Sequence, residues 1–132
     1  MKELEITADV NNLDEVLAFI DADLEENDCP PKTQMQLDVA VEELFVNIAH
    51  YSGSERAIIQ TEINSDEAAI TFIDSGVYYD PLAKPDPDVT LSAEEREIGG
   101  LGIYLVKKSM DSINYERKDD KNILTITKRL HK

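Results

Sequence analysis

The chain has 132 residues, enough for one domain with a single hydrophobic core. Its composition, 42% apolar and 31% charged, is typical of a soluble globular protein, and no apolar run approaches the roughly 20 residues of a membrane span. With 13 Lys and Arg against 28 Asp and Glu, the formal net charge is -15. This charge disfavours binding to nucleic acids and to anionic membranes. A nucleotide could still bind, but a metal ion and local backbone donors would have to hold it in place of a basic surface.

The start of the chain and its cysteine content indicate the cellular compartment in which we expect the protein. Residues 1–5 lack the apolar segment of a signal peptide. The single cysteine, Cys29, cannot form an internal disulfide, which fits a reducing environment. We therefore expect a cytoplasmic protein.

The first half of the chain predicts a strand and two helices. Alternating residues 4–8 indicate the strand. Asn12 is the predicted N-cap of a helix that carries Leu13, Val16, Leu17 and Ile20 on one face. Pro31 suits the first turn of a second helix, which extends over about residues 32–51. Its predicted buried positions include Met35, Val39, Leu44 and Ile48.

The second half predicts two hairpins around an irregular segment. Strands at 57–63 and 68–73 are joined by a short turn. Residues 77–98 contain three prolines, many acids and no periodicity, and a loop of this length in a small domain is usually functional or mobile. A helix over 102–110 and a hairpin of strands 112–117 and 122–128 complete the chain.

Short turns between neighbouring strands indicate the fold class. They predict an α+β two-layer sandwich with a mostly antiparallel mixed sheet and helices on one face. No internal repeat or linker divides the chain, so we expect a single domain over residues 1–132.

Two polar residues of the second predicted helix, Glu43 and Asn47, lie four positions apart and share one face. An amide oxygen is a suitable ligand for Mg2+, which bridges phosphates. A carboxylate one helical turn away could orient an attacking hydroxyl or accept its proton. The alternative carboxylate, Glu42, is rotated by about 100° from Glu43. The same spacing also arises from a solvated Glu beside a surface Asn, so this pair alone leaves both interpretations open.

Two glycine motifs suggest a nucleotide. Asp74-Ser75-Gly76 follows a predicted strand, where a carboxylate can accept from an adenine amine while glycine lets the base approach. Residues 99–102 precede a helix, where free N–H groups converge on an anion. The absence of Gly-Lys-Ser/Thr excludes a P-loop, and no strand directly precedes the glycines, which argues against a dinucleotide fingerprint. A common turn and a ligand-free helix start remain alternative interpretations of the two motifs.

Taken together, the motifs resemble those of the GHKL, or Bergerat-fold, ATPases. The chain's size is similar to that of the bacterial anti-sigma-factor serine/threonine kinases of the RsbW and SpoIIAB type, and the likeness extends over about residues 4–130. The matching segments are residues 41–47 for the N-box, Asp74-x-Gly76 for the first glycine box and Gly100-Leu101-Gly102 for the second.

This resemblance implies a protein serine/threonine kinase that uses ATP and Mg2+. It implies that Glu43 is the catalytic carboxylate, that Asn47 ligates Mg2+ and that Asp74 contacts adenine. Residues 77–98 would form the ATP lid, in which Arg96 reaches the terminal phosphate. The further cofactor-binding residues that it implies are Gly76, Gly99, Gly100, Leu101, Gly102 and Asn122.

The resemblance also implies partners. Such kinases phosphorylate a serine or threonine of a small anti-sigma antagonist protein of the STAS type, and their other partner is a sigma factor. We expect these partners here, with no nucleic acid and no membrane, and the sequence leaves a homodimer open.

The chain departs from the family's pattern in the last strand and after the N-box. A Thr that is common near the adenine falls at Asn122 or Ile123, and of these only the Asn122 amide can substitute for it. The His that usually follows the N-box aligns with Tyr51, with the imidazole displaced to His50. The lid segment is unusually acidic and proline-rich.

Two alternatives to the kinase remain at this stage. One is a nucleotide-binding interaction module that sequesters a partner without phosphorylating it. The other is a histidine-kinase catalytic domain, which fits the fold but leaves no room for phosphoacceptor helices, since the first strand begins near Leu4. Glu43 favours the kinase, because binding alone needs no base at that position.

Overall fold

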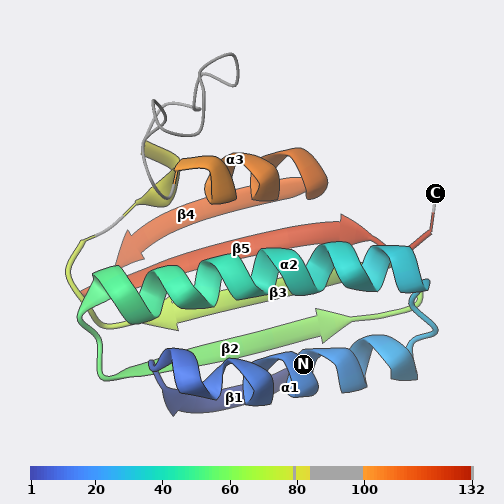
Figure 1. Ribbon diagram of the computed structural model, residues 1–132, viewed down its shortest axis with the longest axis horizontal. Coiled ribbons are helices and arrows are strands. Elements are labelled where there is room, and N and C mark those ends of the chain that lie inside the picture. Colours follow the sequence, from blue (N-terminus) through green and yellow to red (C-terminus); the bar gives the residue numbers. More distant parts are fainter. Residues whose placement is uncertain (79, 84–99, 132) are drawn as a thin grey trace.

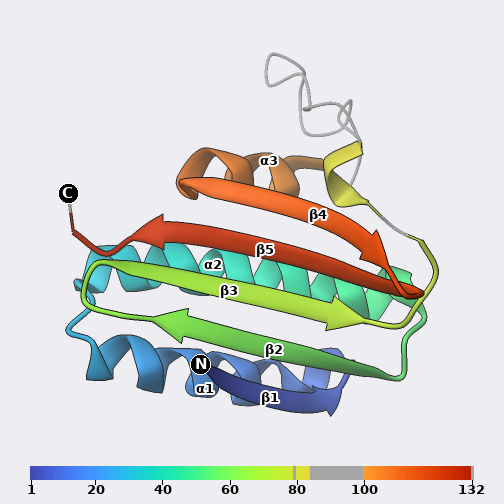
Figure 2. The ribbon, with the colours of Figure 1, turned by 180° about the vertical axis from the view of Figure 1, so that it is seen from behind.

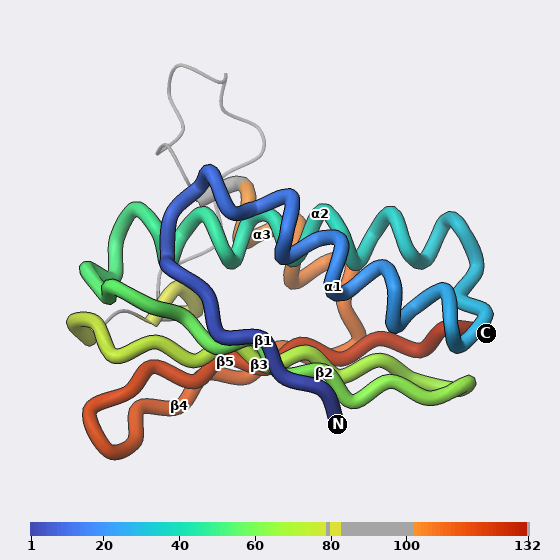
Figure 3. The backbone as a smooth tube through the Cα atoms, turned by 90° about the horizontal axis from the view of Figure 1, so that it is seen from below, coloured from blue at the N-terminus to red at the C-terminus, as the bar shows by residue number. Residues whose placement is uncertain are grey.

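The computed structural model describes residues 1–78, 80–83 and 100–131. In this part of the chain, helices cover one face of a five-stranded sheet (Figure 1, Figure 3). The strand order is β1-β2-β3-β5-β4, and each neighbouring pair is antiparallel. This confirms the α+β sandwich with helices on one face, and no described pair is parallel. The strands are β1 (Lys2–Thr7), β2 (Arg56–Ile63), β3 (Glu67–Asp74), β4 (Ser112–Lys118) and β5 (Lys121–Arg129).

The helical layer lies over the sheet in chain order. Helix α1 covers the side of β1 and β2, α2 crosses the centre, and α3 covers the side of β4 and β5, while the opposite face of the sheet carries no described helix (Figure 1, Figure 2). No helix in the described residues is long and apolar enough to span a membrane. The helices are α1 (Leu13–Glu26), α2 (Pro31–Asn47) and α3 (Gly100–Ser109), with short turns η1 (Val10–Asn12), η2 (Ile48–Ser52) and η3 (Pro81–Ala83).

Strand alternation positions the polar residues of interest. In β3, Ile70 and Phe72 are buried beneath the helices, and the same two-residue period puts Asp74 on that face. In β5, Asn122 shares its face with the buried Leu124. Asp74 and Asn122 are paired directly across the two strands. The core pattern therefore places a carboxylate and an amide together at one end of the sheet.

The predicted buried face of the second helix is partly wrong. Leu44 is buried, but Met35 and Val39 are 66% and 53% exposed. Met35 lies nine positions before Leu44, about half a rotation away at 100° per residue, so one buried face cannot contain both. The residues of α2 that are buried in the core are Leu37, Ala40, Val41, Leu44 and Phe45.

The two predicted helix starts have different outcomes. Pro31 is the first residue of α2, as predicted. Asn12 occupies the N-cap position of α1, but its side chain makes no capping hydrogen bond. Its Nδ2 instead donates to the Thr7 carbonyl at 3.0 Å, because the chain turns directly from β1 into the helix.

Two carboxyl groups, Asp21 of α1 and Asp38 of α2, lie between the first two helices. The Oδ1 atom of each is buried without a hydrogen-bond partner among the described residues. Burial raises the pKa of Asp38 to about 8, with further contributions from a hydrogen bond to Asp21 and from the charges of Asp21 and Glu25. Ionised carboxylates only accept hydrogen bonds, so a single proton would satisfy both groups.

We expect this pair to make stability depend on pH. Because the folded-state pKa of Asp38 lies above its unfolded value, the folded state binds more protons between about pH 4 and pH 8. The free energy of unfolding should therefore fall as the pH rises through this window. Asp38→Asn should flatten the slope and stabilise the protein at pH 8 by about 1–2 kcal/mol, after discounting for its partial exposure.

Urea denaturation at pH 5 and pH 8 checks this expectation. Glu62→Gln replaces an exposed carboxylate of β2 and should keep the wild-type slope. If Asp38→Asn also keeps it, the carboxyl pair does not share a proton.

Candidate functional site

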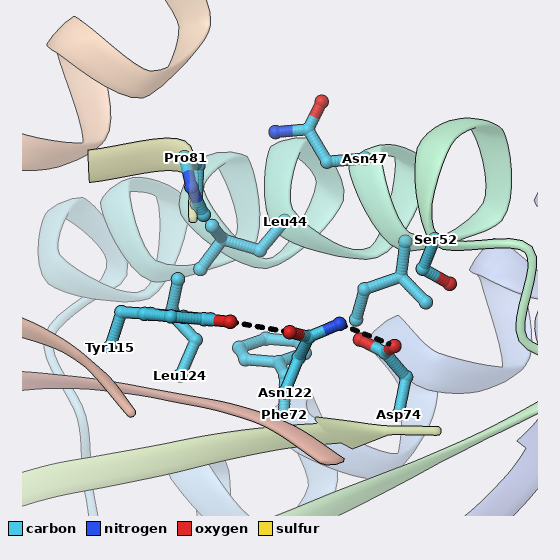
Figure 4. A pocket seen from close by; sticks show the side chains of 10 residues that line it. Leu44, Asn47, Ser52, Phe72, Asp74, Pro81, Tyr115, Asn122 and Leu124 are labelled. Carbon is cyan, nitrogen blue, oxygen red and sulfur yellow. Dashed lines mark hydrogen bonds between the residues drawn. The ribbon is translucent and has the colours of Figure 1, made fainter. Parts of the chain in front are cut away.

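A pocket lies between the C-terminal half of α2 and the ends of β3 and β5. Figure 4 shows Asp74 and Asn122 on the sheet side, with Leu44 and Asn47 of α2 opposite them. Its free volume is about 30 Å³, room for about one water molecule, so a base enters only if lining side chains move. The pocket is lined by Leu44, Asn47, Ile48, Ser52, Phe72, Asp74, Pro81, Tyr115, Asn122 and Leu124.

Asp74 is buried and uses one oxygen for the fold. Its Oδ1 accepts from the Gly76 amide at 2.9 Å and from Asn122 Nδ2 at 3.0 Å. Its Oδ2 accepts no hydrogen bond from the described residues. One carboxylate oxygen is thus held by the protein, and the other can accept from a donor in the pocket, such as an exocyclic amine.

Asn122 connects Asp74 to strand β4. Its Nδ2 donates to Asp74 and also to the Val77 carbonyl at 2.8 Å. Its Oδ1 accepts from the Tyr115 hydroxyl and from Arg117 Nη1, the latter at 3.2 Å. Each end of the amide faces complementary partners, so the orientation of Asn122 is fixed. The structure therefore places Asn122, of the two predicted alternatives, beside Asp74.

Hydrogen bonds hold the Asp74-x-Gly76 turn against Ser52, which follows α2, and against Arg117 of β4. The Val77 amide donates to the Ser52 carbonyl at 2.8 Å, and Arg117 Nη1 donates to the Gly76 carbonyl at 2.9 Å. A Cβ atom on Gly76 would lie 2.0 Å from the Ser52 carbonyl oxygen. Glycine is required at this position because two backbone segments approach each other without space for a side chain.

Glu43 lies against the beginning of α3. A Cβ atom on Gly102 would lie 2.1 Å from both Cδ and Oε1 of Glu43. The Glu43 carboxylate thus packs on the backbone of Gly102, the last glycine of the second glycine motif. Glu42 is exposed, as its rotated position predicts.

The environment of Glu43 makes it a stronger base. Burial raises the pKa of its carboxyl above the usual range, and the charge of Glu42 raises it further. The nearby Asn47 amide opposes this rise. A carboxylate with a raised pKa accepts a proton more readily, which suits the deprotonation of a hydroxyl.

Asn47 supplies an unsatisfied amide close to Glu43. It is buried, and its Nδ2 makes no hydrogen bond of ordinary geometry with a described residue. In the part of the chain that the structure describes, no group of three or more His, Cys, Asp or Glu residues could hold a metal alone. Mg2+ usually takes one or two protein oxygens and obtains the rest from phosphates and waters. The side-chain oxygen of Asn47 suits a Mg2+ of this kind, which does not need a cage made of protein ligands alone.

The predicted phosphate-binding residues are only partly described. Gly100, Leu101 and Gly102 form the first turn of α3, which begins two residues before the predicted start at Gly102. Arg96 and Gly99, and most of the predicted lid over residues 77–98, lie outside the described residues.

Some residues of the pocket and its hydrogen-bond network were not predicted as site residues from the sequence, among them Ser52, Tyr115 and Arg117. Tyr115 and Arg117 lie two positions apart in β4 and both contact Asn122. That two-residue spacing was a usable signal, because it places both side chains on one face of the strand. Ser52 contributes through its backbone carbonyl, which no sequence pattern reveals.

Comparison with curated proteins gives a kinase relative. The serine/threonine-protein kinase BtrW of Bordetella bronchiseptica is 33% identical over 61 residues. These residues are 46% of this chain and 43% of BtrW, so the match spans less than half of the relative.

Comparison with solved structures shows the same fold. The structure of the RsbU and RsbW domains of Rv1364c from Mycobacterium tuberculosis matches 98% of this chain and 33% of that chain, with a TM-score of 0.67 and 14% identity. The Acinetobacter baumannii histidine kinase AdeS matches 100% of this chain and 70% of that chain, with a TM-score of 0.52 and 15% identity.

A family model for the histidine kinase-like ATPase domain matches residues 6–128. The match includes Glu43, Asn47, Asp74 and Asn122, and the antiparallel sheet with helices on one face agrees with the solved structures. The chain therefore belongs to the histidine kinase-like ATPase domain family.

Proposed function

We propose that this protein is a serine/threonine protein kinase of the anti-sigma-factor type, which transfers the terminal phosphoryl group of ATP to a small partner protein. The observation that carries the proposal is the contact between the Glu43 carboxylate and Gly102. The Glu43 carboxyl, whose pKa is raised by burial, lies beside the N-terminal turn of α3, where backbone N–H groups attract phosphate. This position supports a role for Glu43 as the base. BtrW, whose name describes a serine/threonine-protein kinase, supports this activity.

The nucleotide is proposed to bind with its base between α2 and the sheet. Leu44, Phe72 and Leu124 offer apolar contact, and Asp74 Oδ2 accepts from the exocyclic amine. The phosphates are proposed to bind at the residues preceding and beginning α3, which include Gly99, Gly100, Leu101 and Gly102, with Arg96 as a further phosphate ligand.

In the proposed reaction, Glu43 orients the partner's hydroxyl and accepts its proton as the hydroxyl oxygen attacks the terminal phosphorus of ATP. The bond from that phosphorus to the bridging oxygen breaks, and ADP leaves. Asn47 would hold Mg2+, which would supply positive charge that offsets the charge of the phosphates. The product gains about -1.5 to -2 charges. Repulsion from a protein of net charge -15 then favours release of the phosphorylated partner.

The proposed substrate is an anti-sigma antagonist of the STAS type, and the second proposed partner is a sigma factor. The RsbW domain in the structurally similar Rv1364c supports this class of kinase through the shared fold. We propose that the reaction takes place in the cytoplasm, and a homodimer stays a prediction.

Asp74→Asn should weaken ATP and ADP binding. The amide oxygen can keep the hydrogen bonds from Gly76 and Asn122, which puts the NH2 group at the position of Oδ2. A donor then faces the adenine amine, and an unpaired buried polar group costs roughly 1–3 kcal/mol. Calorimetry should therefore show a roughly 5- to 150-fold loss of affinity. The control is Ser75→Ala at the exposed neighbouring side chain, and unchanged affinity in Asp74→Asn would remove Asp74 from the site.

The proposed function is tested by incubating the protein with ATP labelled at the terminal phosphate, Mg2+ and candidate antagonist proteins from the same genome. We expect acid-stable label on a serine or threonine of one candidate. Acid-labile label on a histidine would indicate a histidine kinase. Tight binding of a candidate without transfer would favour the alternative, a catalytically silent nucleotide-binding module.

A further inference from the structure

A second hollow lies along the helical layer, toward the N-terminal end of α2 and away from Asn47. There α2 and α3 lie next to each other (Figure 1). A groove of about 370 Å³ is lined by residues of these two helices. Three of the large apolar side chains that line it are exposed: Met35, Val39 and Leu105 are 66%, 53% and 50% exposed. Large apolar residues that gather in one exposed groove are typical of an interaction site.

The groove continues into a hollow with positive charge. Gln36, Lys108 and Ser109 line both spaces, and the second has a volume of about 600 Å³. The second hollow contains four of the chain's 13 Lys and Arg residues, although the chain's net charge is -15. These cations come from three elements and are Lys32, Lys108, Lys128 and Arg129.

No ion pair joins the cations of the groove to an acid among the residues that the structure describes. The ion pairs seen among the described residues join Lys2 and Arg56 to acids elsewhere. The Lys108 ammonium lies 5.4 Å from the centre of the Tyr104 ring, and Lys128 Nζ donates to a backbone carbonyl. Asp111 approaches Arg129, but its carboxylate accepts from the backbone amide. The groove thus keeps a local positive charge on an acidic protein.

We propose that this groove docks an acidic amphipathic helix of a partner protein. The partner's apolar face would cover Met35, Val39 and Leu105, and its acids would face Lys32 and Lys108. A helix has a diameter of about 10–12 Å and presents one apolar stripe, which suits a groove between two helices. An anionic membrane also attracts lysines, but it would face the acidic remainder of the surface. This docking goes beyond the proposed phosphoryl transfer, because it uses the opposite part of α2.

The test uses a fluorescein-labelled synthetic peptide of about 18 residues with leucines at helical spacing and glutamates at the remaining positions. Fluorescence anisotropy without nucleotide should show saturable binding to the wild-type protein. Leu105→Ser and Lys108→Glu, both at exposed positions, should each weaken binding about tenfold. The matched controls are Val10→Ser and Lys118→Glu, which are exposed and outside the groove and should bind as the wild type does.

Several results would overturn the docking proposal. These are the absence of saturable binding, equal binding of a peptide with lysines in place of glutamates, and equal loss in the control variants. If the peptide fails but phosphatidylserine vesicles sediment the protein in a Lys108-dependent way, the surface binds membranes. If light scattering shows a dimer that Leu105→Ser dissociates, the groove joins two copies. Because the measurement needs no ATP, its failure and the failure of the kinase assay are separate results.

Discussion

Glu43→Gln should reduce phosphoryl transfer by 10²–10⁴-fold, the usual cost of losing a general base. Glutamine keeps the length of the side chain and its packing on Gly102, so folding and ATP affinity should stay close to wild type. The wild-type rate should rise with pH through the pKa of Glu43, which burial holds above its usual value, and the variant should lose this rise. Single-turnover transfer of labelled phosphate across a pH series measures both effects.

The matched control is Glu42→Gln on the same helix. Glu42 is exposed, and its side chain is rotated by about 100° from that of Glu43. Transfer by this variant should stay within a few-fold of wild type. Equal losses in the two variants would mean that the charge of this helix turn matters and that no single carboxylate acts as the base.

Gly76→Ala should both destabilise the fold and abolish nucleotide binding. The new Cβ would lie 2.0 Å from the Ser52 carbonyl oxygen, and both segments are backbone, so no flexible side chain can yield. Overpacking of this kind costs about 1–3 kcal/mol and would displace the turn that carries Asp74. Denaturation and ATP calorimetry measure the two effects.

Gly102→Ala is the variant to compare with Gly76→Ala, because here the added Cβ meets a side chain and not backbone. Its Cβ would meet the end of the Glu43 side chain, which can rotate away. We therefore expect near-normal stability with impaired transfer. If Gly76→Ala is as stable as Gly102→Ala and still binds ATP, the turn is more adaptable than its contacts indicate.

The fold and half of the site follow from local patterns. Short turns between strands predict the antiparallel sheet, and the two-residue period of β3 and β5 places Asp74 and Asn122 on the helical face. The contact between Glu43 and Gly102 could not be predicted in the same way. It depends on how α3 packs beside α2, and the segment between β3 and α3 has no periodicity from which its course could be read.

The prediction that Met35 and Val39 of α2 are buried was wrong for a simple reason. Met35 and Val39 are apolar, and apolar residues in a helix are usually assigned to the core. Their angular position relative to Leu44 shows that they face away from it. Apolar residues outside the buried stripe needed another explanation, which the groove beside Leu105 supplies.

The proposed nucleotide pocket is assembled from segments that only the complete fold brings together. Asp74 is the last residue of β3 and Asn122 the second residue of β5, while Tyr115 lies in β4 and Leu44 in α2. An unfolded chain has no such site, so a ligand bound here stabilises the native state alone. At a concentration 100 times its dissociation constant, the gain is about 2.7 kcal/mol. The melting temperature of the protein thus reports the occupancy of the pocket without a label or an enzymatic assay.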